Sequence, residues 1–299
     1  MREAFNDWEP SNASGQALLH HTNVIIAEYR AQGYVLTLRQ LYYQFVARDL
    51  IPNTERSYKN LGELVKKGRM AGSIDWSAIV DRGRSAEMWP QWNDPADLIT
   101  GAAASYRLDR WAGQERYVEV WVEKDALASV VEPACDALHV RWLACRGYSS
   151  ATAMYDGAER FKLASDDGKW NLLIYLGDHD PSGMDMSRDV ADRLDEMQAT
   201  DVEVHRIALN MDQVDQYDPP PNPTKFTDSR QASYVARFGR ESWELDALEP
   251  AVMDSLIRDR IEEVLDRQAY EKVVEQEDLD KELISRFTNE MMTERGMVE

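Results

Sequence analysis

Three carboxylate residues have the types and the positions of a cation site. Glu123 follows an apolar run at 117–122, and Asp178 and Asp180 follow a second apolar run that ends at Leu176. Oxygen ligands without cysteine or histidine favour a hard cation, Mg²⁺ or Mn²⁺. A Mg²⁺ ion held by a few carboxylates keeps open positions for phosphate oxygens. We therefore predict that Glu123, Asp178 and Asp180 bind Mg²⁺, or alternatively Mn²⁺, next to a phosphate.

The D-x-D-P-x-G sequence at 178–183 also has a purely structural interpretation. A carboxylate in a turn can cap the helix that follows, and for an isolated motif this is the more common role. The position of Glu123 at the end of an earlier strand favours the cation site instead. Lys124 either contacts a phosphate or pairs with an acid. The ring of His179 is expected to point away from both neighbouring aspartates.

A second candidate site lies in a predicted helix at 37–50, where Arg39 and Tyr43 are four residues apart. Residues at this spacing lie on one face of a helix, so a guanidinium and a phenol are presented together. Such an arginine can hold a phosphate and stabilise a phenolate, and a tyrosine that attacks phosphorus forms a phosphotyrosyl bond. On spacing alone, the simpler interpretation is a surface tyrosine beside a salt-bridged arginine. Tyr42 belongs to the apolar stripe of this helix and is assigned to the core.

The elements that must position the tyrosine are helical. Three helices are predicted first, at 15–31, 37–50 and 54–70. Thr37 and Thr54 are the expected N-caps of the second and third, and a turn at 51–53 separates them. The stretch 72–84 is predicted to be a turn followed by extended chain, and a further helix is predicted at 96–110. Helix, tight turn, helix and extended ribbon is the order of a winged helix-turn-helix.

The elements that must position the carboxylates alternate between strands and helices. In order, the predicted elements are strand 117–122, helix 126–138, strand 140–144, helix 149–163, strand 172–176, helix 183–197 and strand 202–209. Fully apolar strands that alternate with helices predict a parallel sheet covered on both faces. Such sheets bind ligands at the carboxyl ends of their strands, where Glu123 lies. A stiff linker or loop is expected at 218–223, and a mostly helical, acidic region at 244–299.

The motifs at these positions resemble those of a known family. Val122-Glu123-Lys124 together with the later stretch L-G-D-H-D-P-S-G at 176–183 resembles the TOPRIM domain. The D-P-x-G continuation resembles its version in the A subunit of topoisomerase VI and in relatives that act in meiotic recombination. The stretch R-Q-L-Y-Y at 39–43 resembles the R-x-x-Y-Y motif of that family, and E-L-D-A-L at 244–248 resembles a late motif.

The resemblance implies a fold. It implies an α/β chain with a winged-helix DNA-binding domain, a TOPRIM metal-binding domain with a parallel βαβ sheet and a helical acidic region packed on it, at 1–110, 115–240 and 241–299. The winged helix carries the tyrosine, and the cation site lies in the TOPRIM domain.

The resemblance also implies an activity. Tyr43 corresponds to the family's nucleophile, which forms a 5′-phosphotyrosyl bond, and Arg39, Glu123 and Lys124 are the accompanying catalytic candidates. The expected reaction is Mg²⁺-dependent cleavage and rejoining of double-stranded DNA by an enzyme similar to a type IIB topoisomerase A subunit. In that family a homodimer cuts both strands, and the tyrosine of one protomer works with the metal site of the other.

The distribution of charge bears on a DNA partner. The formal net charge of −20, taken as a whole, argues against nucleic acid. However, 1–110 holds 13 basic and 13 acidic residues, and 36–86 has a net charge of +4. The basic residues of the predicted helix 54–70 are either phosphate contacts or an ordinary solvated face: Arg56, Lys59, Lys66, Lys67 and Arg69.

Other features limit the class of protein. The chain has no apolar run long enough to span a bilayer and no recognisable targeting peptide, so we expect a cytoplasmic, nucleoid-associated or phage-encoded protein without membrane contact. It has no nucleotide-binding glycine motif, so strand passage driven by ATP would need a separate B-type ATPase subunit. Two alternatives stay open: a TOPRIM nuclease that hydrolyses DNA with metal-activated water, and a non-catalytic DNA-binding protein.

Overall fold

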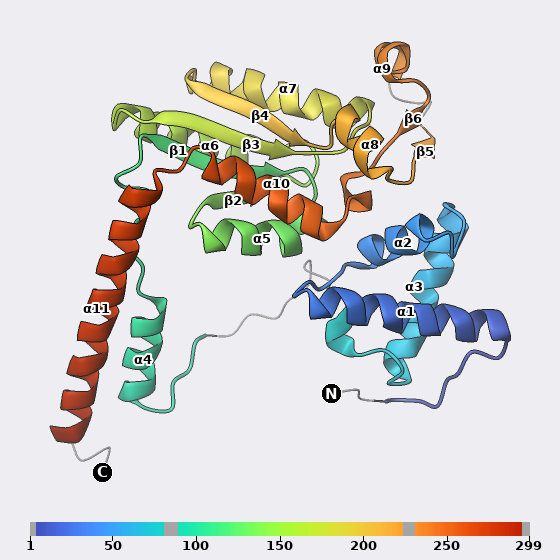
Figure 1. Cartoon of the computed structure of the whole chain (residues 1–299), viewed down its shortest axis with the longest axis horizontal. Coiled ribbons are helices and arrows are strands. Elements are labelled where there is room, and N and C mark those ends of the chain that lie inside the picture. Colours follow the sequence, from blue (N-terminus) through green and yellow to red (C-terminus); the bar gives the residue numbers. More distant parts are fainter. Residues whose placement is uncertain (1–3, 81–88, 224–230, 295–299) are drawn as a thin grey trace.

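The computed structural model describes residues 4–80, 89–223 and 231–294. Within these residues the protein is a mixed α/β structure with eleven α-helices, a four-stranded parallel sheet and a two-stranded ribbon. Figure 1 shows the first three helices beside the sheet and its covering helices, whereas the long helix α11 (Arg267–Glu294) extends away from the sheet together with α4 (Pro95–Ser105).

The first three helices share one hydrophobic core. They are α1 (Ala13–Ala31), α2 (Leu38–Ala47) and α3 (Glu55–Met70). The predicted N-caps are confirmed, because Thr37 and Thr54 accept hydrogen bonds from backbone N–H groups of the following turns, and Gln40 completes a capping box in α2. The predicted apolar stripe of α2 is also confirmed: Leu41 and Phe45 are 0% exposed.

The segment after α3 differs from the prediction. In place of extended chain, it contains a short 3-10 helix, η1 (Trp76–Ala78), before Ile79 forms an isolated bridge with Leu36. The Asp75 side chain accepts a hydrogen bond from the backbone N–H of Ser77, which favours a tight turn at this point. The end of the predicted stretch, 81–84, lies outside the described residues.

Helix α4 is shorter than the predicted helix 96–110. It ends at Ser105, and the next residues contact α11 instead of continuing the helix. The buried Glu277 of α11 accepts hydrogen bonds from the Leu108 backbone N–H at 3.0 Å and from the Arg110 guanidinium at 2.9 Å. These long-range bonds take the place of the helical hydrogen bonds that the local sequence favours.

The sheet has the parallel arrangement that the sequence predicts. Its strands are β1 (Arg116–Val122), β2 (Arg141–Ala144), β3 (Trp170–Leu176) and β4 (Val202–Ala208), in the order β2-β1-β3-β4. Side chains alternate between the two faces. Val120 and Ile174 belong to one hydrophobic core, and Trp121 and Tyr175 belong to another on the opposite face.

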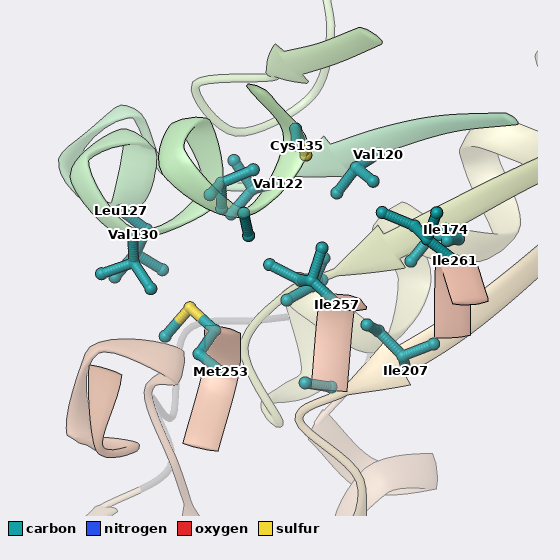
Figure 2. Packing of buried hydrophobic residues seen from close by; sticks show 14 of the residues in the cluster. Val120, Val122, Leu127, Val130, Cys135, Ile174, Ile207, Met253, Ile257 and Ile261 are labelled. Atoms are coloured by element: carbon teal, nitrogen blue, oxygen red, sulfur yellow. The ribbon is translucent and has the colours of Figure 1, made fainter. Parts of the chain in front are cut away.

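Two pairs of helices cover the two faces of the sheet. On one side lie α5 (Ala128–Ala137) and α10 (Pro250–Glu262), and on the other α6 (Ala151–Asp166) and α7 (Pro181–Glu196). Figure 2 shows Ile257 and Met253 of α10 packed in the same core as Val120 and Ile174 of the sheet. The sheet is therefore the middle layer of three.

The order of the strands reverses at β1. From β1 the chain passes through α5 to β2, and then through α6 to β3 on the other side of β1. The loops that leave β1 and β3 therefore turn toward opposite faces, which opens a crevice at the carboxyl ends of these two strands. Glu123 and Asp178 lie in these two loops.

Several short elements after the sheet were not predicted. They are α8 (Met211–Tyr217), β5 (Asn222–Pro223), α9 (Gln231–Phe238), β6 (Glu241–Ser242) and η3 (Leu245–Ala247). The prediction of a plain linker at 218–223 is wrong at its end, since Asn222 pairs with Ser242 in an antiparallel ribbon. Asn53 also donates hydrogen bonds to the Pro221 carbonyl and the Asn222 side chain, at 2.8 and 2.9 Å.

No helix in the described part of the chain combines the length and the apolar character that crossing a membrane requires.

Candidate functional site

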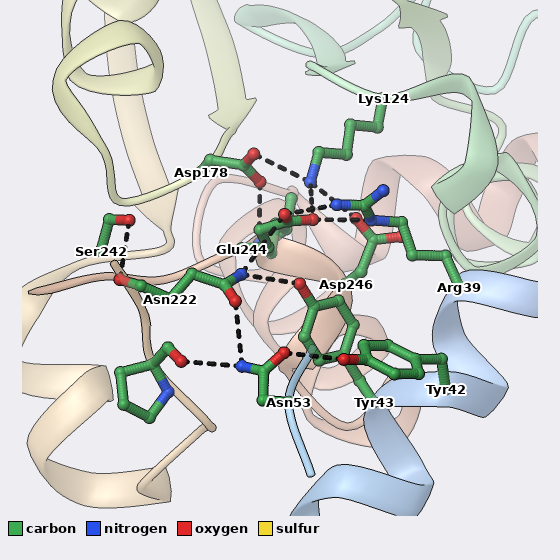
Figure 3. A network of polar contacts seen from close by, with 12 residues as sticks. Arg39, Tyr42, Tyr43, Asn53, Lys124, Asp178, Asn222, Ser242, Glu244 and Asp246 are labelled. Atoms are coloured by element: carbon green, nitrogen blue, oxygen red, sulfur yellow. Dashed lines mark hydrogen bonds and ion pairs between the residues drawn. The ribbon is translucent and has the colours of Figure 1, made fainter. Parts of the chain in front are cut away.

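Residues of both candidate sites line one cleft of about 960 Å³. Among its lining residues are all those to which the sequence assigns catalysis or metal binding: Arg39, Tyr43, Glu123, Lys124, Asp178 and Asp180. The first two come from α2, and the others come from the loops after β1 and β3. Figure 3 shows the side chains of α2 opposite Lys124 and Asp178. A single chain therefore contains both groups in one cleft, whereas the family resemblance implies a tyrosine that works with the metal site of the other protomer.

Glu123 is a buried carboxyl group at the end of β1. It is 7% exposed, and its Oε2 accepts a hydrogen bond from the backbone N–H of Asp178 at 2.9 Å. Burial and the nearby charge of Asp178 raise the pKa of Glu123 to about 7. Negative charge is therefore crowded at this point, and a cation placed there would favour the ionised carboxylate.

The two aspartates of the loop after β3 have different contacts. Asp178 is buried: its Oδ1 accepts a hydrogen bond from the backbone N–H of Leu245 at 2.8 Å, and its Oδ2 lies 2.8 Å from the ammonium of Lys124. Burial raises the pKa of Asp178, although Lys124 opposes this effect. Asp180 accepts a hydrogen bond from the Gly183 N–H at 2.6 Å and caps α7. The capping interpretation is thus confirmed for Asp180, which also lines the cleft.

The loop that carries these aspartates is held by Arg206 of β4. The Arg206 guanidinium donates hydrogen bonds to the carbonyl oxygens of Gly177, Asp178 and Gly183, at 2.8, 2.6 and 3.0 Å. Close packing restricts the loop as well, because a Cβ atom at Gly183 would overlap the carbonyl oxygen of Asp178. Both features fix the position of the aspartate backbone.

The ring of His179 is part of an aromatic cluster. Its Nδ1 lies 2.7 Å from the hydroxyl of Tyr234, and the ring packs edge-on against Phe238 and Trp243. Burial lowers the pKa of His179 to about 4, so the ring is neutral at physiological pH. These contacts agree with the expectation that His179 does not face the cation ligands.

Lys124 lies among three carboxylates. Its Nζ is 2.8 Å from Asp178, 3.0 Å from Glu244 and 2.7 Å from Asp246 (Figure 3). Burial disfavours the charged amine, but Asp246, Asp178 and Glu244 raise the pKa of Lys124 above its ordinary value. Of the two roles that the sequence allowed, pairing with acids is the one that the structure shows.

Glu244 joins Lys124 to the guanidinium of Arg39. Arg39 donates one hydrogen bond from Nε to Oε2 at 2.7 Å and another from Nη2 to Oε1. Burial opposes ionisation of Glu244, but Lys124 and Arg39 lower its pKa to about 2. The predicted salt bridge of Arg39 is confirmed, and its partner lies 205 residues away in the sequence.

Tyr43 is not a surface residue, so the simpler interpretation is wrong for the tyrosine, although its salt bridge is present. Its side chain is 2% exposed, because α2 packs both of its tyrosines inward. The hydroxyl accepts a hydrogen bond from Asn222 Nδ2 at 2.8 Å, and the Arg39 guanidinium lies 6.0 Å from the ring centroid. Burial and the charge of Glu244 raise the pKa of Tyr43. Tyr42 is also buried, as predicted, and its hydroxyl donates to Asn53.

Within residues 4–80, 89–223 and 231–294, no group of three or more His, Cys, Asp and Glu side chains has the arrangement of a metal site. Hydrogen bonds and the Lys124 ion pair already engage each of the three predicted ligands. The donor chemistry still fits a hard cation, since the oxygens are carboxylates and their crowding raises the pKa of Glu123. Asp246 also has a buried oxygen, Oδ1, without a hydrogen-bond partner among the described residues.

The basic residues of α3 divide into two kinds. Four are exposed: Arg56, Lys59, Lys66 and Lys67. Arg69 is half-buried and donates hydrogen bonds to the carbonyl oxygens of Trp76, at 2.8 Å, and Ile79. Lys59 forms an exposed ion pair with Glu55 at 2.6 Å, which a phosphate could displace at little cost. Arg69 instead holds the segment that follows α3.

Four residues of the site carried no assigned role in the sequence, and one of them is Asp246, which pairs with Lys124. Arg206 holds the aspartate loop from a neighbouring strand, Asn222 contacts Tyr43, and Glu244 joins Arg39 to Lys124. The only sequence signal was the E-L-D-A-L motif that includes Glu244. A neutral amide in a proline-rich stretch gives no comparable signal.

The chain matches no protein-family model and no curated protein. An acid-rich crevice at the reversal point of a parallel sheet faces a helix that presents an arginine and a tyrosine.

Proposed function

We propose that this protein is a metal-dependent DNA-cleaving and rejoining enzyme that uses Tyr43 as its nucleophile. The N-terminal helices would form a winged-helix domain, and the sheet would form a TOPRIM-type domain. The observation that carries the proposal is the shared cleft, in which Tyr43 and Arg39 of α2 lie with Glu123, Asp178 and Asp180. The resemblance of the R-x-x-Y-Y and D-H-D-P-S-G motifs to those of the topoisomerase VI A family supports the same chemistry.

The proposed reaction is a transesterification. Tyr43 Oη attacks the phosphorus of a DNA phosphodiester, a bond from phosphorus to the tyrosine oxygen forms, and the bond to the 3′ oxygen breaks. The tyrosine loses a proton and the released 3′ oxygen gains one, so the reverse reaction rejoins the strand. Arg39 and Lys124 would stabilise the charge of the phosphate during the transfer. The buried, neutral phenol of the free protein must lose its proton for this step.

Glu123, Asp178 and Asp180 are the residues that would hold Mg²⁺ or Mn²⁺. When bound, the ion would supply positive charge at a phosphate oxygen. Lys124 would then exchange its contact with Asp178 for one with the substrate. The proposed substrate is double-stranded DNA, contacted by the exposed cations of α3, and cutting of both strands implies a homodimer with two clefts.

The test uses supercoiled plasmid with Mg²⁺ or Mn²⁺, stopped by detergent and compared on gels with and without protease. Wild type should give breaks linked to protein. Tyr43→Phe should reduce these breaks by about 10³-fold or more, because it removes the nucleophile, and Asp178→Ala should abolish them. Tyr42→Phe is the matched control, since it removes a neighbouring hydroxyl that bonds Asn53 and not Asn222. Linked breaks that survive in Tyr43→Phe would exclude this residue as the nucleophile.

Burial of the Tyr43 phenol favours one alternative, a nuclease that hydrolyses DNA with metal-activated water. In that case the ends would be free of protein, and cleavage would need Asp178 and not Tyr43. The same gel distinguishes the two reactions. Failure of wild type to cleave DNA with either metal would contradict both.

A further inference from the structure

Donor groups from three described side chains converge on the carboxylate of Glu244. Arg39 donates from Nε and Nη2, Lys124 Nζ lies 3.0 Å from Oε2, and Asn222 Nδ2 lies 3.4 Å from Oε1. They come from α2, the loop after β1 and β5, so the whole chain must fold to assemble them. A planar guanidinium with an ammonium and an amide is an arrangement that suits phosphate as well as carboxylate.

This group of donors lies directly beside the tyrosine. The Asn222 amide that approaches Glu244 also donates to the Tyr43 hydroxyl, at 2.8 Å. Arg39, Lys124, Asn222 and Glu244 all line the same cleft as Tyr43. An anion that replaced the Glu244 carboxylate would therefore be separated from the phenol oxygen by a single amide group.

We infer that Arg39, Lys124 and Asn222 form the binding site for a DNA phosphodiester group, and that Glu244 occupies this site in the DNA-free protein as an internal competitor. The inference rests on the proposed function, because it places the bound phosphate next to Tyr43. It adds Asn222 as a binding residue and gives Glu244 a regulatory role. Two features support the substitution: both groups carry one negative charge, and both present two oxygens to the guanidinium.

The competition would lower the affinity for DNA. A site that is free for only a fraction of the time binds its ligand more weakly by that fraction. If Glu244 occupied the site about 90% of the time, DNA would bind about tenfold more weakly than to an open site. Glu244 is ionised down to about pH 2, so the competitor would act over the whole physiological range.

The test measures DNA affinity without cleavage. A fluorescently labelled duplex is titrated with protein in the presence of EDTA, and binding is followed by anisotropy. Glu244→Gln should bind about tenfold more tightly than wild type, because the neutral amide no longer holds Arg39 and Lys124. The matched control is Glu241→Gln, an exposed glutamate three residues earlier that loses the same charge. It should differ from wild type by less than about twofold.

A second variant shows whether the gain in DNA affinity depends on Arg39. In the Arg39→Met background, Glu244→Gln should increase the affinity much less, because only Lys124 and Asn222 are then released, and a double-mutant cycle measures the difference directly. Glu244→Asp, which keeps the charge on a shorter side chain, should give an intermediate gain and serves if Glu244→Gln does not fold. A Glu244→Gln protein that is less stable but binds DNA as Glu241→Gln does would show a purely structural ion pair and overturn the inference.

The inference and the proposed function can fail separately. Tighter binding by Glu244→Gln, together with absence of protein-linked breaks in the wild type, would keep the anion site and remove the tyrosine reaction. Protein-linked breaks that need Tyr43, with no gain in affinity for Glu244→Gln, would keep the reaction and remove the competitor.

Discussion

Glu123 shows how a cleft with several acids affects a single side chain. It is buried beside Asp178, whose charge makes ionisation of Glu123 unfavourable, and its pKa rises to about 7. The unfolded chain has no such neighbours, so there the carboxyl ionises near 4.5. The difference between the two states links folding to pH.

We predict that Glu123 lowers the stability of the metal-free protein as the pH rises. Between about pH 4.5 and about pH 7 the folded state keeps a proton that the unfolded chain has released, so the free energy of unfolding falls over this range. Glu123→Gln removes this loss. Its free energy of unfolding, relative to that of wild type, should therefore increase from about pH 5 to about pH 8. Mg²⁺ should stabilise wild type at the upper end, since it favours the carboxylate. Thermal unfolding across this range, with and without Mg²⁺, measures both effects.

The control for this prediction is Glu115→Gln, which alters an exposed glutamate just before β1. Its unfolding should follow the wild-type pH profile. Parallel profiles for wild type and Glu123→Gln would mean that the carboxyl does not titrate differently in the folded state.

At the residue scale, the sequence predicted the positions of side chains that directly follow a strand or belong to the apolar stripe of a helix. Glu123 and Asp178 could be placed because apolar runs mark the strands they follow, and Tyr42 because its spacing matches the stripe of α2. Burial of Tyr43 could not be predicted, because Asn222, which covers its hydroxyl, is 179 residues away. Local periodicity carries no information about such a partner.

At the scale of elements, the junction between β3 and α7 depends on a glycine. We predict that Gly183→Ala destabilises the protein by about 1–3 kcal/mol, because its Cβ would overlap the carbonyl oxygen of Asp178 and displace the first turn of α7. It should also weaken the response of the protein to Mg²⁺. Urea unfolding and the thermal shift with Mg²⁺ measure the two effects.

Gly113→Ala is a suitable comparison, since a Cβ at Gly113 meets no atom within 4 Å. Its stability should stay within about 0.5 kcal/mol of wild type. If Gly183→Ala unfolded at the same urea concentration as Gly113→Ala, the close packing would have no energetic role.

The long elements were predictable and the short ones were not. The four strands and the caps of α2 and α3 follow from runs and spacings within a few residues. The ribbon of β5 and β6 has only two residues in each strand, and its partners Asn222 and Ser242 are distant in sequence. The prolines at 219–221 and 223 favoured a linker, whereas tertiary contacts decide the structure there.

At the scale of the whole molecule, the separation of charge decides how DNA can bind despite the net charge of −20. We predict that Lys66→Ala reduces the slope of log affinity against log salt concentration by about one. This is the change expected when one phosphate contact, and the DNA counterion that it releases, is lost. Lys162→Ala, on α6 of the strongly acidic part, should leave the slope unchanged. Anisotropy titrations at several salt concentrations measure it. Equal slopes for Lys66→Ala and wild type would mean that Lys66 does not contact a DNA phosphate.

Arg69→Ala should behave differently from Lys66→Ala. Its guanidinium holds the carbonyl oxygens of Trp76 and Ile79, so its removal should lower stability more than it changes the salt dependence. The sequence could not separate these two residues, because both are cations of the same predicted helix.

The distance of 205 residues between Arg39 and Glu244 has a consequence during synthesis of the chain. At about 5–20 residues per second, roughly 10–40 s pass between the translation of Arg39 and that of Glu244. Throughout this time Arg39 lacks the Glu244 carboxylate, and Lys124 and Asn222 are also synthesised before Glu244. Because the chain must fold as a whole to bring these donors together, the network cannot form before Glu244 and the helix α10 that follows it have been synthesised.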